Sequence, residues 1–155
     1  MNPTFLREAI RLSLENVTAN EGGPFGAVVV RDQQIIGRGR NRVISTNDPT
    51  AHAEVVAIRD ACAHLKAFTL TGCEIYTSCE PCPMCLSSIY WARLSRIYYA
   101  ADRHDATAAG FDDEKLYREL SLPIADRAIP MSQSLREEAA VAFQRWLEKN
   151  DRVEY

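Results

Sequence analysis

The sequence predicts an α/β protein with a three-layer α/β/α architecture and a central mixed sheet. Short runs rich in valine, isoleucine and tyrosine, which favour strands, alternate along the chain with segments whose apolar residues recur at helical spacing. Polar turns join these segments, with no repeat and no linker between them. The 155 residues are 46% hydrophobic and 25% charged, an ordinary globular composition. We therefore expect one domain over residues 1–155.

The first half of the chain is expected to hold a helix, a hairpin and a second helix. Residues 3–20 favour a helix because leucine, isoleucine and valine recur there every three or four positions. Two short apolar runs, 26–32 and 34–39, surround a polar turn, which is typical of an antiparallel hairpin. A stripe of alanines then indicates a helix that begins at the Asp-Pro-Thr stretch of residues 48–50 and continues to residue 65.

The second half alternates strands with helices. Residues 73–78 and 96–100 have the composition of strands, and residues 84–94, which follow two prolines, favour a helix between them. Further helices are expected over residues 111–120 and 132–150. This order implies a partly parallel sheet that is covered on both faces.

Charge and hydropathy restrict the possible partners and compartments. The net charge is −3, from 18 basic and 21 acidic residues without a basic run, so nucleic acid is not an expected partner. Charges interrupt the apolar residues of the N-terminus, and no later stretch is long enough for a membrane span, so we expect a cytoplasmic protein without membrane contact. Five cysteines, three of them within nine residues, indicate metal binding or catalysis in a reducing compartment.

The run Pro81-Cys82-Pro83-Met84-Cys85 predicts two metal ligands at one helix start. If Pro83 is the first helical residue, Cys82 is the N-cap and Cys85 lies one turn away. The positive end of the helix dipole favours thiolate, the form that binds metal, and paired thiolates suit zinc.

The second helix offers His52 as a third ligand, with Glu54 two residues later. Side chains two residues apart diverge by about 200° on a helix, so both can serve one metal only if it lies off the helix end. Cys79 leaves two alternatives open. A site that includes Cys79 is a closed structural zinc site, whereas His52 with two cysteines leaves the fourth position open, as in catalytic zinc sites. We favour the open site, because the closed site gives no use to Glu54.

These motifs resemble the zinc-dependent cytidine deaminase superfamily. The His52-Ala53-Glu54 triplet and the later Pro-Cys-x-x-Cys run match its two-part signature. The stretches GGPFGAVVV, NDPTAHAEV, YTSCEPCPMC, IYWAR and AGFDD, with the final Tyr155, resemble bacterial guanine deaminases over nearly the whole chain. The resemblance implies a cytidine deaminase-like fold with about five strands in the sheet.

The resemblance also implies an activity and a set of site residues. It implies hydrolytic deamination of guanine to xanthine and ammonia by a zinc-bound hydroxide, with one zinc per chain and Glu54 as the proton shuttle. It implies a homodimer, with exchange of C-terminal segments between chains as one arrangement, and a lid at residues 151–155. The implied zinc ligands are His52, Cys82 and Cys85, and the implied substrate-binding residues are Asn41, Asp113, Phe25, Trp91 and Tyr155.

Other readings of the same residues remain. Taken alone, Asn41 is typical of a turn, Asp113 of a solvated loop, and Phe25 and Trp91 of a core. A tRNA adenosine deaminase shares the zinc signature, and a deaminase of cytosine or an aminotriazine differs from a guanine deaminase only in pocket contacts. A zinc-stapled binding module without catalysis is the non-enzyme alternative.

Overall fold

The computed structural model describes residues 1–111 and 113–154, and in this part of the chain one mixed sheet has four strands in the order β2-β1-β3-β4. The β1–β2 and β1–β3 pairs are antiparallel, and the β3–β4 pair is parallel. The mixed sheet is as predicted, although the expected number was about five strands. The strands are β1 (Gly26–Arg31), β2 (Gln34–Arg40), β3 (Glu74–Cys79) and β4 (Arg96–Ala101).

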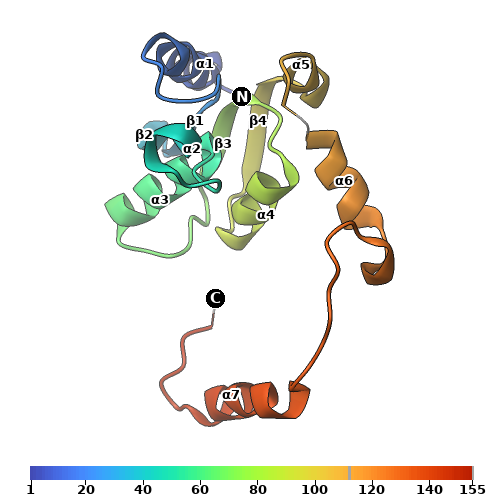
Figure 1. Cartoon of the computed structure of the whole chain (residues 1–155). Helices are drawn as coiled ribbons and strands as arrows, with labels where there is room; N and C mark the ends of the chain where they lie inside the picture. The colour runs from blue at the N-terminus through green and yellow to red at the C-terminus, as the bar shows by residue number, and fades with distance from the viewer. Residues whose placement is uncertain (112, 155) are drawn as a thin grey trace. The chain divides into compact units, whose positions relative to one another are not determined.

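Helices cover both faces of this sheet, as the three-layer prediction requires (Figure 1). On one face, Val28 and Val30 of β1 pack with Phe5 and Leu12 of helix α1 (Pro3–Thr18). On the opposite face, the alternate β1 residues pack against helices α3 (Ala53–Leu65) and α4 (Pro83–Trp91). The side chains of β1 alternate between two apolar cores, which fixes its register.

The candidate site lies at one end of the sheet, where strand β1 begins and strands β2 and β3 end. Because β1 runs antiparallel to both β2 and β3, Gly26 at the start of β1 lies opposite Arg40 at the end of β2. The chain therefore enters or leaves the sheet at this same end at residue 25, at residue 41 and in the segment that follows β3.

The helix starts agree with the predictions at α1 and α4, although these helices end earlier than expected, at Thr18 and Trp91. Helix α3 begins at Ala53, later than residue 48, because the Asp48 side chain accepts hydrogen bonds from Thr50 in a separate turn. Two short helices were not predicted, and they are α2 (Val43–Thr46) and α5 (Arg103–Ala108).

The chain divides into two compact units, Met1–Glu114 and Lys115–Tyr155. The expectation of a single domain stays a prediction. Helix α6 (Asp113–Ser121) crosses the unit boundary, and the second unit continues with a short 3-10 helix, η1 (Ile124–Asp126), and helix α7 (Arg136–Glu148). None of the described residues of the second unit is buried. Within residues 1–111 and 113–154, no helix combines the length and the apolar character that crossing a membrane requires.

Candidate active site

The start of α3 places His52 and Glu54 toward one centre. His52 is the N-cap residue, with extended backbone angles (φ −67°, ψ 155°), so its ring lies beyond the helix end. Glu54 lies in the first turn of α3 and is only 7% exposed. A centre off the end of the helix can therefore be reached from both side chains.

The start of α4 has the predicted cap. Cys82 is the N-cap residue (φ −64°, ψ 168°), and Pro83 is the first helical residue. Cys85 follows one turn later and is fully buried. Pro83 fixes this geometry locally, because its ring presets the first helical φ and it lacks an N–H that would need a partner.

Three side chains converge where the two helix starts meet. The Nδ1 atom of His52 lies 3.6 Å from Sγ of Cys82 and 3.5 Å from Sγ of Cys85. Among the described residues, these are the one group of histidine, cysteine or acidic residues whose ligand atoms are close enough to hold a metal ion. A tetrahedral zinc with Zn–N of about 2.05 Å and Zn–S of about 2.3 Å places nitrogen and sulfur about 3.6 Å apart. The donor set and its spacing therefore fit zinc.

The cluster perturbs the acidity of its own groups. A hydrogen bond from the Cys85 thiol lowers the pKa of Cys82 to about 4, and the same hydrogen bond raises the pKa of Cys85. The hydrogen bond between His52 and Cys82 raises the pKa of the imidazole. Burial raises the pKa of the Glu54 carboxyl to about 7. One thiolate is thus already favoured before metal binding, which is the state that a zinc ligand requires.

Cys79 does not belong to this cluster within the described part of the chain. Its Sγ donates a hydrogen bond to the Asp102 carbonyl oxygen at 3.4 Å, and burial raises its pKa to about 11. The zinc ligands are therefore one histidine and two cysteines, the pattern of an open catalytic site.

A cavity of about 350 Å³ lies over the metal cluster and is lined by most of the predicted site residues. They come from the end of the sheet described above and from the starts of helices α3, α4 and α6. The predicted residues that line the cavity are Phe25, Asn41, His52, Glu54, Cys82 and Asp113.

Phe111 is a cavity residue that the sequence analysis missed. Its ring meets the ring of Phe25 edge to face, with 4.8 Å between centroids and 80° between planes. Glu80, Val43 and Ile44 also line the cavity and were not predicted. The proximity of Phe111 to Asp113 in the AGFDD stretch was the available signal.

Asn41 is held in a defined orientation at the cavity wall. It is 6% exposed, and its Oδ1 accepts from the backbone N–H groups of Gly23 at 3.4 Å and Val43 at 3.3 Å. Its side-chain Nδ2 has no hydrogen-bond acceptor within residues 1–111 and 113–154. The amide can therefore donate to a ring acceptor in the cavity.

The structure does not bring every predicted residue to the cavity. Trp91 ends α4, is 63% exposed and is not among the described residues that line the cavity. Tyr155 lies outside the described residues.

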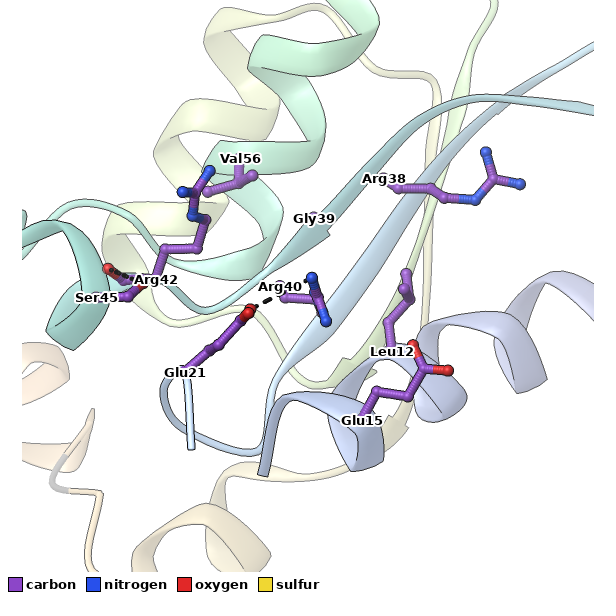
Figure 2. Close-up of a pocket in the computed structure, with 9 residues that line it drawn as sticks. All are labelled: Leu12, Glu15, Glu21, Arg38, Gly39, Arg40, Arg42, Ser45 and Val56. Atoms are coloured by element: carbon purple, nitrogen blue, oxygen red, sulfur yellow. Dashed lines mark hydrogen bonds and ion pairs between the residues drawn. The ribbon is translucent and has the colours of Figure 1, made fainter. Parts of the chain in front are cut away.

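A larger cavity, of about 530 Å³, lies along β2 and has a different character (Figure 2). Two of its three arginines pair with acidic residues: Arg40 with Glu21 at 3.3 Å, and Arg38 with Glu8 of α1 at 3.3 Å. It contains none of the metal-binding residues. This cavity is the larger of the two, but the metal ligands and the Glu54 carboxyl lie at the smaller one.

Comparison with known proteins agrees with this geometry. Residues 2–101 match the family described as the cytidine and deoxycytidylate deaminase zinc-binding region. The guanine deaminase of Bacillus subtilis strain 168 is 52% identical over 152 residues, which are 98% of this chain and 97% of that protein. The X-ray structure of the Bacillus subtilis guanine deaminase superposes with a TM-score of 0.96 over 100% of this chain and 99% of that one. A tRNA-specific adenosine deaminase of Aquifex aeolicus is 40% identical over 99 residues, 63% of this chain and 64% of that protein.

Proposed function

The chain belongs to the cytidine and deoxycytidylate deaminase zinc-binding family, and from this premise we propose that it converts guanine and water to xanthine and ammonia. The observation that carries the proposal is the cluster of His52, Cys82 and Cys85, with the buried carboxyl of Glu54 beside it in one cavity. The relative that supports guanine as the substrate matches nearly the full length of the chain.

The chain's own residues supply the proton transfers. Zinc held by His52, Cys82 and Cys85 would lower the pKa of a water molecule and so supply a nucleophile at neutral pH. Glu54 takes a proton as the oxygen adds to the ring carbon that bears the amino group. It delivers this proton to the ring nitrogen, then takes the remaining proton of the added oxygen and passes it to the amino group, which leaves as ammonia as the carbon–nitrogen bond breaks and the C=O bond forms. Exclusion of water by the cavity wall strengthens these interactions.

Recognition of the base falls to the residues around the ligands. The free donor of Asn41 suits a ring acceptor, and the carboxylate of Asp113 suits the N–H groups of the purine edge. Phe25 offers an aromatic ring for packing against the base. The roles of Trp91 and Tyr155 rest on resemblance.

The tRNA adenosine deaminase reading has less support. A protein that grips a folded RNA needs a clustered basic surface, whereas this chain has a net charge of −3. Two arginines of the larger cavity, Arg38 and Arg40, already pair with carboxylates.

The test is ammonia release from zinc-loaded protein given guanine, cytosine or a tRNA anticodon stem in separate reactions. Release from guanine, with little from the other two, supports the proposal. Release from the RNA alone contradicts it, and release from none of the substrates favours the non-catalytic zinc module.

We also propose that the protein is a homodimer. The apolar residues of α7 are exposed, with Phe143 at 72% and Leu147 at 65%. A 13-residue helix with an uncovered apolar face is marginal in water and favours association. In this proposal a second copy covers the face, and the segment 151–155 closes over a metal site.

A further inference from the structure

Asn16 is a fully buried asparagine on the face of α1 that packs against the sheet. It is 0% exposed. An apolar side chain is the ordinary choice at such a position, because a buried amide must be hydrogen-bonded to offset its lost hydration. The other buried residues of α1 are Phe5, Ala9, Leu12 and Ser13.

The amide nitrogen of Asn16 joins two segments that are far apart in sequence. Its Nδ2 donates to the carbonyl oxygen of Gly23 at 2.8 Å and to the carbonyl oxygen of Asn41 at 2.9 Å. The reversed amide would place Oδ1 against two carbonyl oxygens, so the contacts determine its orientation. Oδ1 itself accepts no hydrogen bond within residues 1–111 and 113–154. The side chain therefore acts as a double donor to the backbone, at the cost of one unpaired acceptor of its own.

Both carbonyl groups belong to the backbone that orients the Asn41 side chain. The Gly23 N–H donates to Asn41 Oδ1, so Asn16, Gly23 and Asn41 form a closed set of hydrogen bonds. The Asn41 N–H donates to the carbonyl oxygen of Phe25 at 3.1 Å. A Cβ atom on Gly22 would lie 2.4 Å from the Asn41 carbonyl oxygen. The loop before β1 and the end of β2 are thus packed without spare room.

We infer that Asn16 is a positioning residue for substrate recognition, which fixes the direction of the Asn41 amide toward the base. The inference rests on the proposed function, and it adds a residue that lines neither the cavity nor the metal cluster. Asn16 acts through Asn41, so its loss weakens recognition of the base while the zinc ligands keep their places.

The test is a double-mutant cycle on kcat/KM for guanine, with zinc content and melting temperature measured for each protein. Asn16→Leu removes both donors with little change in size. We expect it to lower kcat/KM by about ten- to a hundredfold at full zinc content, because a displaced recognition group misaligns the base. In the Asn41→Ala background the same change should lower kcat/KM by less than about threefold, because the group that Asn16 positions is already absent.

Ser13→Ala is the matched control on the same buried face. The Ser13 hydroxyl donates to the Ile10 carbonyl oxygen of its own helix at 2.7 Å. Its removal should lower the melting temperature and leave kcat/KM within about twofold of the wild type, since the hydroxyl bonds to its own helix and not to the backbone around Asn41. Gly22→Ala is the second variant, and it serves if Asn16→Leu does not fold. Its methyl group would lie 2.4 Å from the Asn41 carbonyl oxygen that Asn16 also contacts, so it should displace Asn41 and give the same loss of kcat/KM, which is again smaller in the Asn41→Ala background.

Wild-type kcat/KM in Asn16→Leu, or an equal loss in both backgrounds, would overturn the positioning role. A wild-type protein that releases no ammonia from guanine contradicts the proposed function instead, and with it the substrate part of this inference.

Discussion

Glu54 is the residue on which catalysis is expected to depend most. It is buried beside the zinc ligands without being one of them, so its removal should separate chemistry from metal binding. We predict that Glu54→Gln keeps one zinc per chain and lowers the rate of ammonia release by about a hundredfold to ten thousandfold, the usual contribution of a positioned acid/base. Metal analysis beside a steady-state assay checks this. Glu74→Gln, on β3, is the control and should retain activity. Full activity in Glu54→Gln would assign the proton transfers to another group.

His52 and His64 offer a matched comparison on one helix. His52 is the N-cap of α3 and a metal ligand, whereas His64 lies exposed in its last turn. We predict that His52→Ala weakens zinc binding by at least about a hundredfold, since changes in the surroundings of zinc ligands alone cost ten- to a hundredfold. His64→Ala should bind zinc like the wild type. Competition with a chromophoric chelator measures both, and equal affinities would remove His52 from the ligand set.

Helix α3 lies close to β2 because two glycines face it. A Cβ on Gly39 would lie 2.0 Å from the Ala53 carbonyl oxygen, and one on Gly37 would lie 2.5 Å from the Ala57 carbonyl oxygen. Both Gly→Ala changes should lower the free energy of unfolding, by about 1–3 kcal/mol as overpacking usually does. The clash from Gly39 falls on the first turn of α3, next to His52. We therefore predict that only Gly39→Ala also weakens zinc binding. Denaturant melts and zinc titrations test this, and equal zinc affinity in the two variants would contradict it.

The contact between α1 and the edge strand β2 should make stability depend on pH. The Arg11 guanidinium lowers the pKa of Glu8 below 4.5, with Arg38 of β2 contributing in the same direction. A carboxyl whose folded pKa is lowered adds stability that is present above 4.5 and is lost as the pH falls through the folded value. The free energy of unfolding of Glu8→Gln should therefore be up to about 1 kcal/mol lower than that of the wild type at neutral pH, and the difference should vanish in acid. Melts of both proteins across pH 7 to 3 test this. Glu15→Gln should lower the free energy of unfolding by less, because Glu15 pairs with Arg11 of its own helix.

Local signals explain which elements could be predicted from the sequence. Pro83 alone determined the start of α4 and thus the places of Cys82 and Cys85. Helices α2 and α5 were missed because four and six residues are too few for a periodic pattern. The late start of α3 was missed because its Asp-Pro-Thr signal belongs to a turn. The observed late start makes His52 the N-cap of α3, so its ring lies beyond the helix end, where a centre shared with Glu54 must lie.

The remaining site residues depend on contacts that no local pattern encodes. Phe111 contacts Phe25 because the loop after α5 returns to the end of the sheet where β1 begins. The role of Asn16 was hidden because asparagine in a helix carries no signal until its partners are known. Motif resemblance supplied Asn41 and Asp113, which composition alone would have assigned to turns and solvent.

No residue of the second unit that the structure describes is buried, so the stability of this unit should depend on another surface. We predict that removal of residues 151–155 lowers turnover while zinc stays bound, because these residues form the proposed lid. The described part of this segment is exposed and, apart from Val153, polar, with ion pairs from Lys149 to Asp151 at 2.7 Å and from Arg152 to Glu154 at 3.5 Å. Unchanged kinetics in the truncated protein would exclude a lid.

Co-expression of two chains with impaired activity distinguishes an exchanged lid from one that closes over its own chain. One chain carries Glu54→Gln and keeps its C-terminus, and the other has Glu54 but lacks residues 151–155. If lids are exchanged in a homodimer, a hybrid has one site with both Glu54 and a lid. With random pairing, half of the dimers are hybrids with one complete site in two, so about a quarter of wild-type activity should return. If each lid closes over its own chain, neither site of a hybrid is complete, and activity should not exceed that of the two parents. Purification through different tags on the two chains isolates the hybrid, whose activity per zinc then decides between the arrangements.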